Sequence, residues 1–197
     1  MNASFKKRLC AYLIDIVLVV IIVTIISLFI PISDNAITLN QEMVNLQDSY
    51  LKGDINFTQY FNGSAEIVKD LDQEQIIFYV LMAIVIIAYF VIWPFYHSGQ
   101  TFGKKKLKIR VVKNNDKDAT INDLLIRNVI INSLGYLLIQ LLIVFVLPSE
   151  SYYITLTTLS FIQLIIVLFS AFMIIKRKDK CGIHDLIAKT KVIEVKK

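Results

Sequence analysis

The sequence predicts an all-α membrane protein with four transmembrane helices and a small cytoplasmic β-sheet. Of its 197 residues, 56% are hydrophobic, a share typical of integral membrane proteins. About 20 helical residues cross a bilayer core of about 30 Å, and four apolar runs are long enough to do so. None of them has the charged face that a soluble helix bundle requires. The predicted spans are residues 9–30, 76–95, 124–147 and 154–175.

Charged residues are segregated between the connecting segments. The net charge is +5, yet the segment 33–75 holds two lysines against eight acids. Basic residues instead precede the first span and fill the loop 96–123 and the tail 176–197. The positive-inside rule therefore predicts a multi-pass protein of the cell membrane with cytoplasmic N- and C-termini, a cytoplasmic loop 96–123 and an external segment 33–75.

The same basic residues indicate which partners to expect. They alternate with membrane anchors along the chain and do not gather on a folded soluble face. Orientation in the bilayer and attraction to anionic lipids on the cytoplasmic side explain them. The expected partner is the lipid bilayer, and nucleic acid is not expected.

The first two spans end at residues that suit a membrane boundary. Pro31 closes the first span, since proline cannot continue a helix. In the external segment, residues 67–71 are expected to form a short amphipathic helix that leads into the second span. The second span ends in an aromatic group typical of a membrane interface: Tyr89, Phe90, Trp93, Phe95 and Tyr96.

The loop 96–123 and the tail each contain a predicted strand. Charged and apolar residues alternate from Lys106 to Val111, and polar and apolar residues alternate over 190–195, the period of a half-buried strand. A single hairpin is marginal in water, so we expect strands 107–112 and 190–195 to pair. Thr120 and Asp123 form a capping box, which predicts a helix that runs into the third span.

The third and fourth spans carry polar side chains. Arg127 lies in an interfacial turn at the start of the third span, and a polar stripe follows it at four-residue steps. Such side chains commonly form hydrogen bonds between membrane helices, and a hydrated path beside Asp15 is the less ordinary interpretation. The stripe is Asn128, Asn132, Tyr136 and Gln140, and the fourth span also carries polar residues, Ser160, Gln163 and Ser170.

Asp15 is the acid within the apolar runs. A carboxylate at the centre of a membrane helix costs roughly 2.5–3.5 kcal/mol on insertion scales, so it usually has a partner or a function. It follows Arg8 by seven residues, on the same helix face and roughly 10 Å deeper. Asp15 is either a protonatable group or cation ligand, or a structural acid satisfied by Arg127, Tyr12 or a neighbouring amide. Arg127 in turn either pairs with Asp15 or extends to the interface.

Enzyme chemistry and cofactors are not expected. Residues 99–104 (Gly-Gln-Thr-Phe-Gly-Lys) superficially resemble a phosphate-binding loop. However, the spacing between the two glycines is too short, and no serine or threonine follows the lysine. His97 and His184 are the histidines, and no third ligand accompanies them in a metal-site spacing. Cys181 and His184 are close in sequence but lie in a basic segment expected at the surface. The sequence thus indicates no catalytic residues, no cofactor and no metal.

Three motifs, in this order along the chain, resemble those of the RDD family of small membrane proteins. Residues 8–15 resemble its opening motif, and residues 99–104 followed by 109–112 resemble its loop signature. Residues 182–190 resemble its closing motif, although Lys189 stands where a glycine is more usual. The resemblance covers most of the chain apart from the external segment and implies a single membrane domain over residues 1–197.

The family is named for one arginine and two aspartates, which the resemblance places at Arg8, Asp15 and Asp185. It implies transport of ions or small solutes, with sodium/proton antiport among the proposals, and Asp15 would then alternate between a proton and a cation. Four spans are few for a transporter, so a homo-oligomer would supply the remaining walls of a transport site.

The alternative interpretation is a non-transporting membrane scaffold or accessory subunit. In it, Arg8, Asp15, Arg127 and Asp185 form a polar clamp that fixes the helices against the cytoplasmic sheet. Both interpretations remain open from the sequence. They share one predicted polar cluster: Arg8, Asp15, Arg127, Asn128, Asn132 and Asp185.

Overall fold

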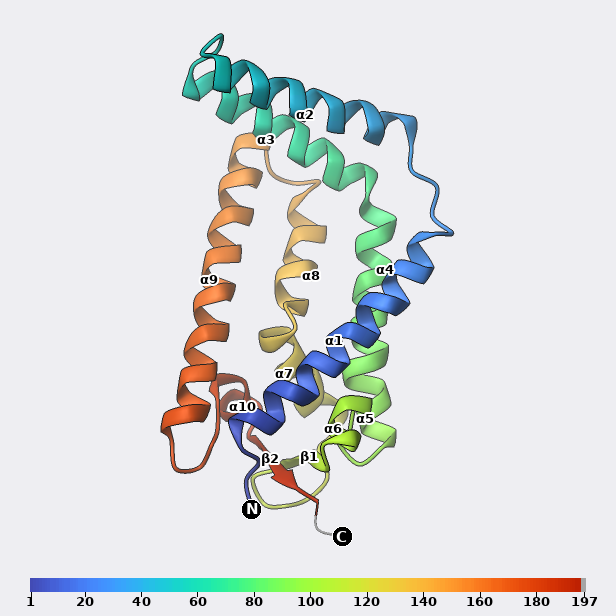
Figure 1. Ribbon diagram of the computed structural model, residues 1–197, viewed down its shortest axis with the longest axis vertical. Coiled ribbons are helices and arrows are strands. Elements are labelled where there is room, and N and C mark those ends of the chain that lie inside the picture. Colours follow the sequence, from blue (N-terminus) through green and yellow to red (C-terminus); the bar gives the residue numbers. More distant parts are fainter. Residues whose placement is uncertain (196–197) are drawn as a thin grey trace.

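A helical hairpin covers one end of a bundle of long helices, and a two-stranded sheet lies at the other end, beside both termini (Figure 1). The computed structural model describes residues 1–195; residues 196 and 197, the end of the predicted tail, lie outside the described residues. The elements are α1 (Phe5–Ser27), α2 (Asp34–Lys52), α3 (Phe57–Glu74), α4 (Ile76–Ile87), the π-helix η1 (Ala88–Ile92), α5 (Trp93–Tyr96), α6 (Phe102–Lys106), β1 (Ile109–Lys113), α7 (Ile121–Ile131), α8 (Leu134–Ile143), α9 (Ser149–Lys176), α10 (Ile183–Ile187) and β2 (Thr190–Glu194).

Three helical rods are long and apolar enough to cross a membrane. They are α1, the continuous run α4–η1–α5 over Ile76–Tyr96, and α9. Large apolar side chains such as Val17 and Phe161 are exposed on their surfaces, as expected for helices that face lipid. These three predicted spans are confirmed as apolar helices.

The third predicted span is not one continuous helix. α7 and α8 meet at an angle of 74°, so the predicted third span over 124–147 is two helices and not one. Ser133 has a φ of 54°, a left-handed conformation that ends a helix. Gly135 lets the start of α8 approach the Val129 carbonyl, which a Cβ would meet at 3.1 Å. The bent pair makes a fourth candidate span if it is taken as one.

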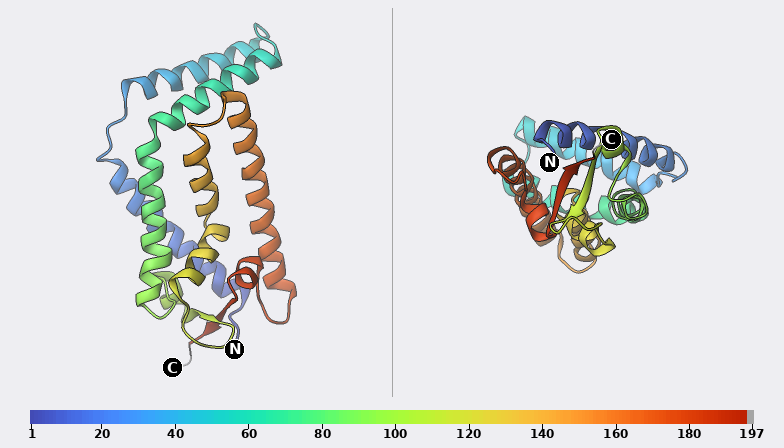
Figure 2. Two further views of the ribbon diagram at one scale, coloured as in Figure 1. Left: turned by 180° about the vertical axis from the view of Figure 1, so that it is seen from behind. Right: turned by 90° about the horizontal axis from the view of Figure 1, so that it is seen from below.

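The segment 33–75 is more ordered than predicted. It forms a hairpin of two helices, α2 and α3, that lies across the ends of α8 and α9 (Figure 2). Local signals build it: Ser33 caps α2, Gly53 (φ 81°) ends α2, and Asn56 forms a capping box at the start of α3. The helix expected over 67–71 is confirmed as the last part of α3, which leads into α4; α3 begins earlier than predicted because Asn56 caps it.

The predicted pairing of the middle loop with the C-terminal tail is confirmed. β1 and β2 are antiparallel, with Val111 opposite Val192 and Lys113 opposite Thr190. The start of the chain covers the other edge of β2, where the Ala3 amide donates to the Val192 carbonyl over 2.9 Å. This contact leaves less of the strand edge open to water.

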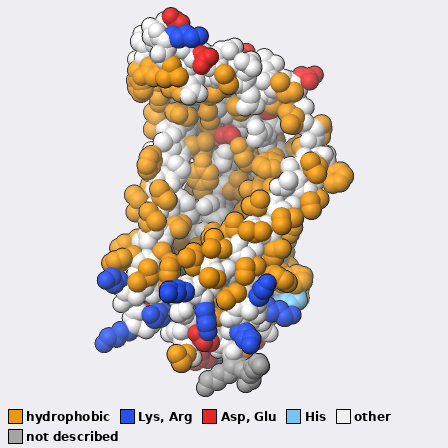
Figure 3. All heavy atoms as spheres, viewed as in Figure 1, with side chains coloured by type: hydrophobic (Ala, Val, Ile, Leu, Met, Phe, Trp, Pro, Cys, Tyr) orange, Lys and Arg blue, Asp and Glu red, His pale blue; other side chains and the backbone are white. Residues whose placement is uncertain are grey.

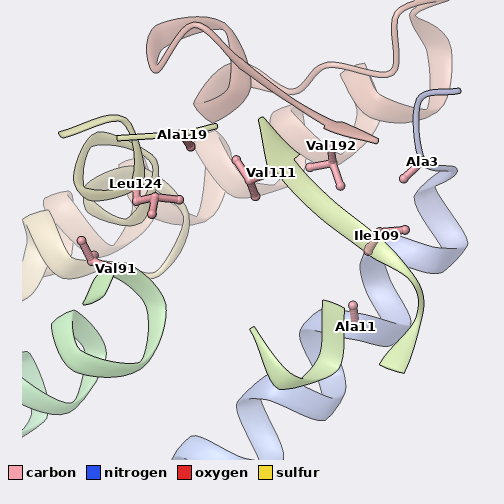
Figure 4. Close-up of a cluster of buried hydrophobic side chains, with 8 residues drawn as sticks. All are labelled: Ala3, Ala11, Val91, Ile109, Val111, Ala119, Leu124 and Val192. Atoms are coloured by element: carbon pink, nitrogen blue, oxygen red, sulfur yellow. The ribbon is translucent and has the colours of Figure 1, made fainter. Parts of the chain in front are cut away.

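The sheet is anchored to the bundle by a small apolar core (Figure 4). Side chains from both strands meet side chains from α1, η1 and α7, so the sheet lies directly beneath the helix ends. The core consists of Ala3, Ala11, Val91, Ile109, Val111, Ala119, Leu124 and Val192.

Charge divides the surface into two ends. Lys and Arg side chains gather at the end with the sheet, acidic side chains lie near the hairpin, and hydrophobic side chains cover the region between them (Figure 3). We call the end that carries β1, β2 and α10 the basic end. The apolar middle and the charged ends match the layers of a bilayer.

Candidate functional site

Asp185 is the centre of an ion-pair cluster at the basic end. Its side chain is fully buried, and Arg8 Nη1 donates to Oδ2 over 2.7 Å. Arg127 Nη1 donates to Oδ1 of the same carboxylate, and the Gly182 amide donates to Oδ2 over 3.0 Å. Arg127 Nη1 also donates to Thr190 Oγ1 over 2.8 Å. One carboxylate therefore joins α1, α7, α10 and β2.

The charges around Asp185 decide its ionisation. Burial alone would raise the pKa of its carboxyl, but the positive charges of Arg127 and Arg8 outweigh burial and hold the pKa well below its usual range. Asp185 is therefore a carboxylate at neutral pH. Its bonds to two arginines share one negative charge between two positive ones.

His184, next to Asp185, is buried and neutral. Burial, with the nearby charge of Arg127, lowers the pKa of His184 to about 3. Its Nδ1 lies 2.8 Å from Ser170 Oγ on α9, which also accepts the Ile183 amide over 3.1 Å. Cys181 is buried as well. The expectation that Cys181 and His184 lie at the surface is wrong, because α10 folds back beneath α9.

Asp15 lies in a separate pocket of neutral donors. Thr101 Oγ1 donates to Oδ2 over 2.5 Å, while Tyr89 OH and the Gly103 amide each donate to Oδ1 over 2.7 Å. The side chain is 1% exposed. Three elements, α1, η1 and α6, thus meet at this carboxylate.

Close backbone contact makes this arrangement around Asp15. At Gly103, a Cβ would lie 2.2 Å from the Ala11 carbonyl oxygen and 2.8 Å from Asp15 Oδ1. Thr101 caps α6 by accepting the Lys104 amide. The loop signature at 99–104 therefore supplies a helix cap at Thr101 and an amide donor at Gly103. Because Gly103 has no side chain, α6 can pack directly against α1.

The structure separates two residues that the sequence analysis considered as partners. Arg127 pairs with Asp185, and within residues 1–195 Asp15 forms no ion pair. The hypothesis of an Asp15–Arg127 pair is wrong, as is the suggestion that Tyr12 satisfies Asp15. The prediction that a neighbouring amide satisfies Asp15 is confirmed, because the Gly103 amide is one of its three donors.

A cavity of about 190 Å³ is lined by Asp15 and by neighbours of Asp185, namely Arg8, Arg127 and His184. Apolar side chains of α1, α7 and α9 form most of its wall, and Arg8, Asp15, Lys104 and Arg127 supply its charges. Lys104 forms no ion pair within residues 1–195. Burial, with the charge of Arg127, lowers the pKa of Lys104 to about 8. A lysine with this pKa exchanges its proton readily near neutral pH.

Asn128 and Asn132 lie beside this cavity. Asn128 Nδ2 donates to the Phe90 carbonyl over 2.9 Å, in the π-helix η1, which ties α7 to the second rod. Asn132 Nδ2 donates to Asn128 Oδ1, but the buried Asn132 Oδ1 has no partner. The bend after Asn132 separates both residues from Tyr136 and Gln140, so the predicted single stripe is wrong.

A third buried carboxylate, Asp72, lies at the hairpin end. Tyr79 OH donates to its Oδ1 over 2.6 Å, and Tyr152 OH donates to its Oδ2 over 2.5 Å. Gln140 Nε2 donates to Oδ2 over 3.1 Å. Sequence reasoning missed Asp72, because it is one of eight acids in the segment 33–75 and no local pattern marks it as buried.

Comparison with protein families gives a match over nearly the whole chain. The model of the RDD family matches residues 2–189. The chain belongs to the RDD family. No curated protein and no solved structure is significantly similar to this RDD protein.

The three residues that the resemblance assigns to the family name, Arg8, Asp15 and Asp185, fall into two groups in the structure. Arg8 and Asp185 form an ion pair, to which Arg127 adds a second arginine. Asp15 stands apart, with neutral donors and the cavity beside it. In this RDD protein, Asp185 therefore joins structural elements, whereas Asp15 lines the cavity.

Proposed function

We propose that this RDD protein is a transport protein of the cell membrane that moves ions or small solutes, with Asp15 as the coupling residue. The observation that carries the proposal is the place of Asp15 at the wall of a cavity without an ion-pair partner within residues 1–195. A carboxylate whose donors are all neutral can bind either a proton or a cation. A carboxylate that already pairs with arginine, like Asp185, cannot.

Lys104 gives the exchange a chemical basis. It lines the same cavity as Asp15, and its pKa is about 8. A monovalent cation that reaches Asp15 replaces the charge of the Lys104 ammonium, and Lys104 then releases its proton. One cation is exchanged for one proton, and the charge of the cavity stays constant.

The proposed orientation follows from the two charged ends. The termini, the sheet and the loop 96–123 lie in the cytoplasm, where anionic lipids attract the lysines and arginines. The α2–α3 hairpin lies outside. The bent pair α7–α8 serves as the fourth span, and a homo-oligomer would close the path along the open faces of the bundle.

The test is cation-driven proton movement in proteoliposomes that contain the purified protein and a pH-sensitive dye. We expect flux driven by a sodium or potassium gradient in wild type and none in Asp15→Asn, because the amide keeps the size of the side chain but carries no negative charge to hold a cation or a proton. Lys104→Gln should also lose flux. Asp118→Asn, which changes an exposed carboxylate, 69% exposed in its side chain, is the matched control and should keep it.

A folded wild-type protein with no flux above empty liposomes would exclude antiport of these ions. Equal flux in wild type and Asp15→Asn would exclude Asp15 as the coupling residue. Thermal stability is measured beside flux, so that loss of folding is separated from loss of coupling.

A second candidate function is a non-transporting membrane scaffold or accessory subunit. The joining of α1, α7, α10 and β2 through Asp185 favours it, since this polar clamp has a structural role of its own. In this case Asp15→Asn keeps the function in cells, because the amide oxygen still accepts from Tyr89 and the Gly103 amide, and the new Nδ2 group donates to the Thr101 hydroxyl, which can turn to accept. Neither function makes the protein an enzyme.

A further inference from the structure

Arg127 has an unused edge. Both hydrogen bonds that it donates, to Asp185 Oδ1 and to Thr190 Oγ1, come from Nη1. Within residues 1–195, its Nε and Nη2 groups donate to no acceptor, although the residue is only 6% exposed. A buried guanidinium normally uses most of its five N–H groups. The unused groups belong to a residue that lines the cavity.

The geometry of this edge selects a ligand. Nε–H and Nη2–H of an arginine point in parallel from one side of the guanidinium plane, and this pair of donors matches the two oxygens of a carboxylate or phosphate group. Asp185 occupies the Nη1 side, so the second side is free for a second acid.

The charges at the cavity require the same kind of ligand. Three cations, Arg8, Lys104 and Arg127, line it. Two carboxylates oppose them, Asp15 at the wall and Asp185 behind it, and His184 is neutral. One positive charge is thus uncompensated beside largely apolar walls, where an unpaired charge is costly. A single negative charge would balance it.

The rest of the wall limits the ligand further. Most of it is apolar, with Leu9 of α1 on one side and Val167 and Ile174 of α9 on another. A fully hydrated inorganic ion gains nothing from such walls, whereas an apolar chain does. The space-filling view shows a hollow above α1, lined by hydrophobic side chains of the bundle (Figure 3), which gives an apolar chain room to extend.

We propose that the cavity binds a monoanionic amphiphile, with its acidic group on the Nε–Nη2 edge of Arg127 and beside the Lys104 ammonium, and its apolar part between α1 and α9. The acidic group is a carboxylate or a phosphodiester, since both carry one negative charge and two suitably spaced oxygens. Its source is either a soluble carboxylic acid or a membrane phospholipid. This binding does not depend on the transport activity of the protein.

The experiment measures the apparent Tm of the full chain in a non-ionic detergent with two anionic probes. Octanoate represents the soluble acids and phosphatidylglycerol the lipids. Octanamide and phosphatidylcholine are the controls without net charge, and ionic strength is held constant. A probe present at 100 times its Kd should raise the apparent Tm by about 5–10 °C, and its control should not. The probe that produces the shift identifies the source.

Two variants place the binding in this cavity. Lys104→Gln removes a cation that forms no ion pair within residues 1–195, and it should weaken binding by about tenfold or more. Lys105→Gln, an exposed neighbour on α6, should bind as wild type does. Arg127→Lys keeps the charge opposite Asp185 without the two-donor edge, and it should also bind less tightly.

Three results would overturn the proposal. They are the absence of a shift with either anionic probe, equal shifts with the anionic probes and their controls, and equal affinities of wild type and Lys104→Gln. Because binding is measured in detergent without a gradient, failure here leaves the transport proposal intact, and a negative flux experiment leaves this one intact.

Discussion

Replacement of Asp185 by asparagine should destabilise the protein strongly. The substitution leaves Arg8 and Arg127 with no carboxylate at a fully buried position. It also turns one acceptor into an Nδ2 donor, which faces either the Arg127 donor at Oδ1 or the Arg8 and Gly182 donors at Oδ2. Loss of one partner from a buried ion pair costs about 3–5 kcal/mol, because the remaining charge stays out of water.

The expected change in apparent Tm follows from the size of the chain. For domains of 150–250 residues, 1 kcal/mol shifts Tm by about 2–4 °C, so Asp185→Asn should lower it by about 6–20 °C. The assay heats detergent-solubilised protein and measures, by size-exclusion chromatography, the fraction that remains monodisperse. Asp118→Asn is the control, since its pair with Arg110 is largely exposed and such pairs contribute little.

A triple substitution tests the reasoning more closely. Asp185→Leu with Arg8→Met and Arg127→Met removes all three charges together, and buried ion clusters replaced by apolar residues often keep or gain stability. The triple variant should therefore be more stable than Asp185→Asn. If Asp185→Asn instead melts within about 2 °C of wild type, the buried cluster does not hold these elements together, and the electrostatic argument is refuted.

Three further predictions concern packing, backbone conformation and pH. Gly103→Ala should lower apparent Tm by several degrees, because the new Cβ would lie 2.2 Å from the Ala11 oxygen; Gly63→Ala, where the Cβ meets only the flexible end of Leu46, should have little effect in the same melting assay. Ser133→Gly should raise stability by up to about 1 kcal/mol, since glycine adopts a φ of 54° without strain; a lower Tm would contradict this. The pKa of His184 is about 3 in the folded protein and about 6.5 in the unfolded chain. The protein should therefore become less stable as pH falls from about 6.5 to 3, because the unfolded state binds the proton first. Melting at pH 7 and pH 5 should show a smaller difference for His184→Asn than for wild type.

Local signals explain why much of the fold was predictable. The apolar runs that became α1, α4–α5 and α9 need no partner to be recognised, since a membrane helix satisfies its own backbone hydrogen bonds. The Thr120 capping box begins α7 as expected. The β1–β2 pairing was predictable because both segments alternate with the same period and a single hairpin is marginal in water.

The bend after α7 and the α2–α3 hairpin depended on weaker signals. The run 124–147 is apolar throughout, and hydropathy does not distinguish a straight helix from two helices that meet at 74°. In the hairpin, Ser33, Gly53 and Asn56 act as caps, but residues of these types are also common in loops. Packing of α3 against α9 decides that the segment forms a helical hairpin and not a loop.

The sequence by itself determined which residue types could interact: a basic end, an apolar middle, and the charged residues Arg8, Asp15, Arg127 and Asp185. Only the tertiary structure decided how they pair. Asp185 takes both arginines, and Asp15 takes neutral donors from η1 and α6. The physical reason is distance: the pairing of charges 58 or 177 positions apart depends on how the helices and the sheet pack, and no local rule contains that information.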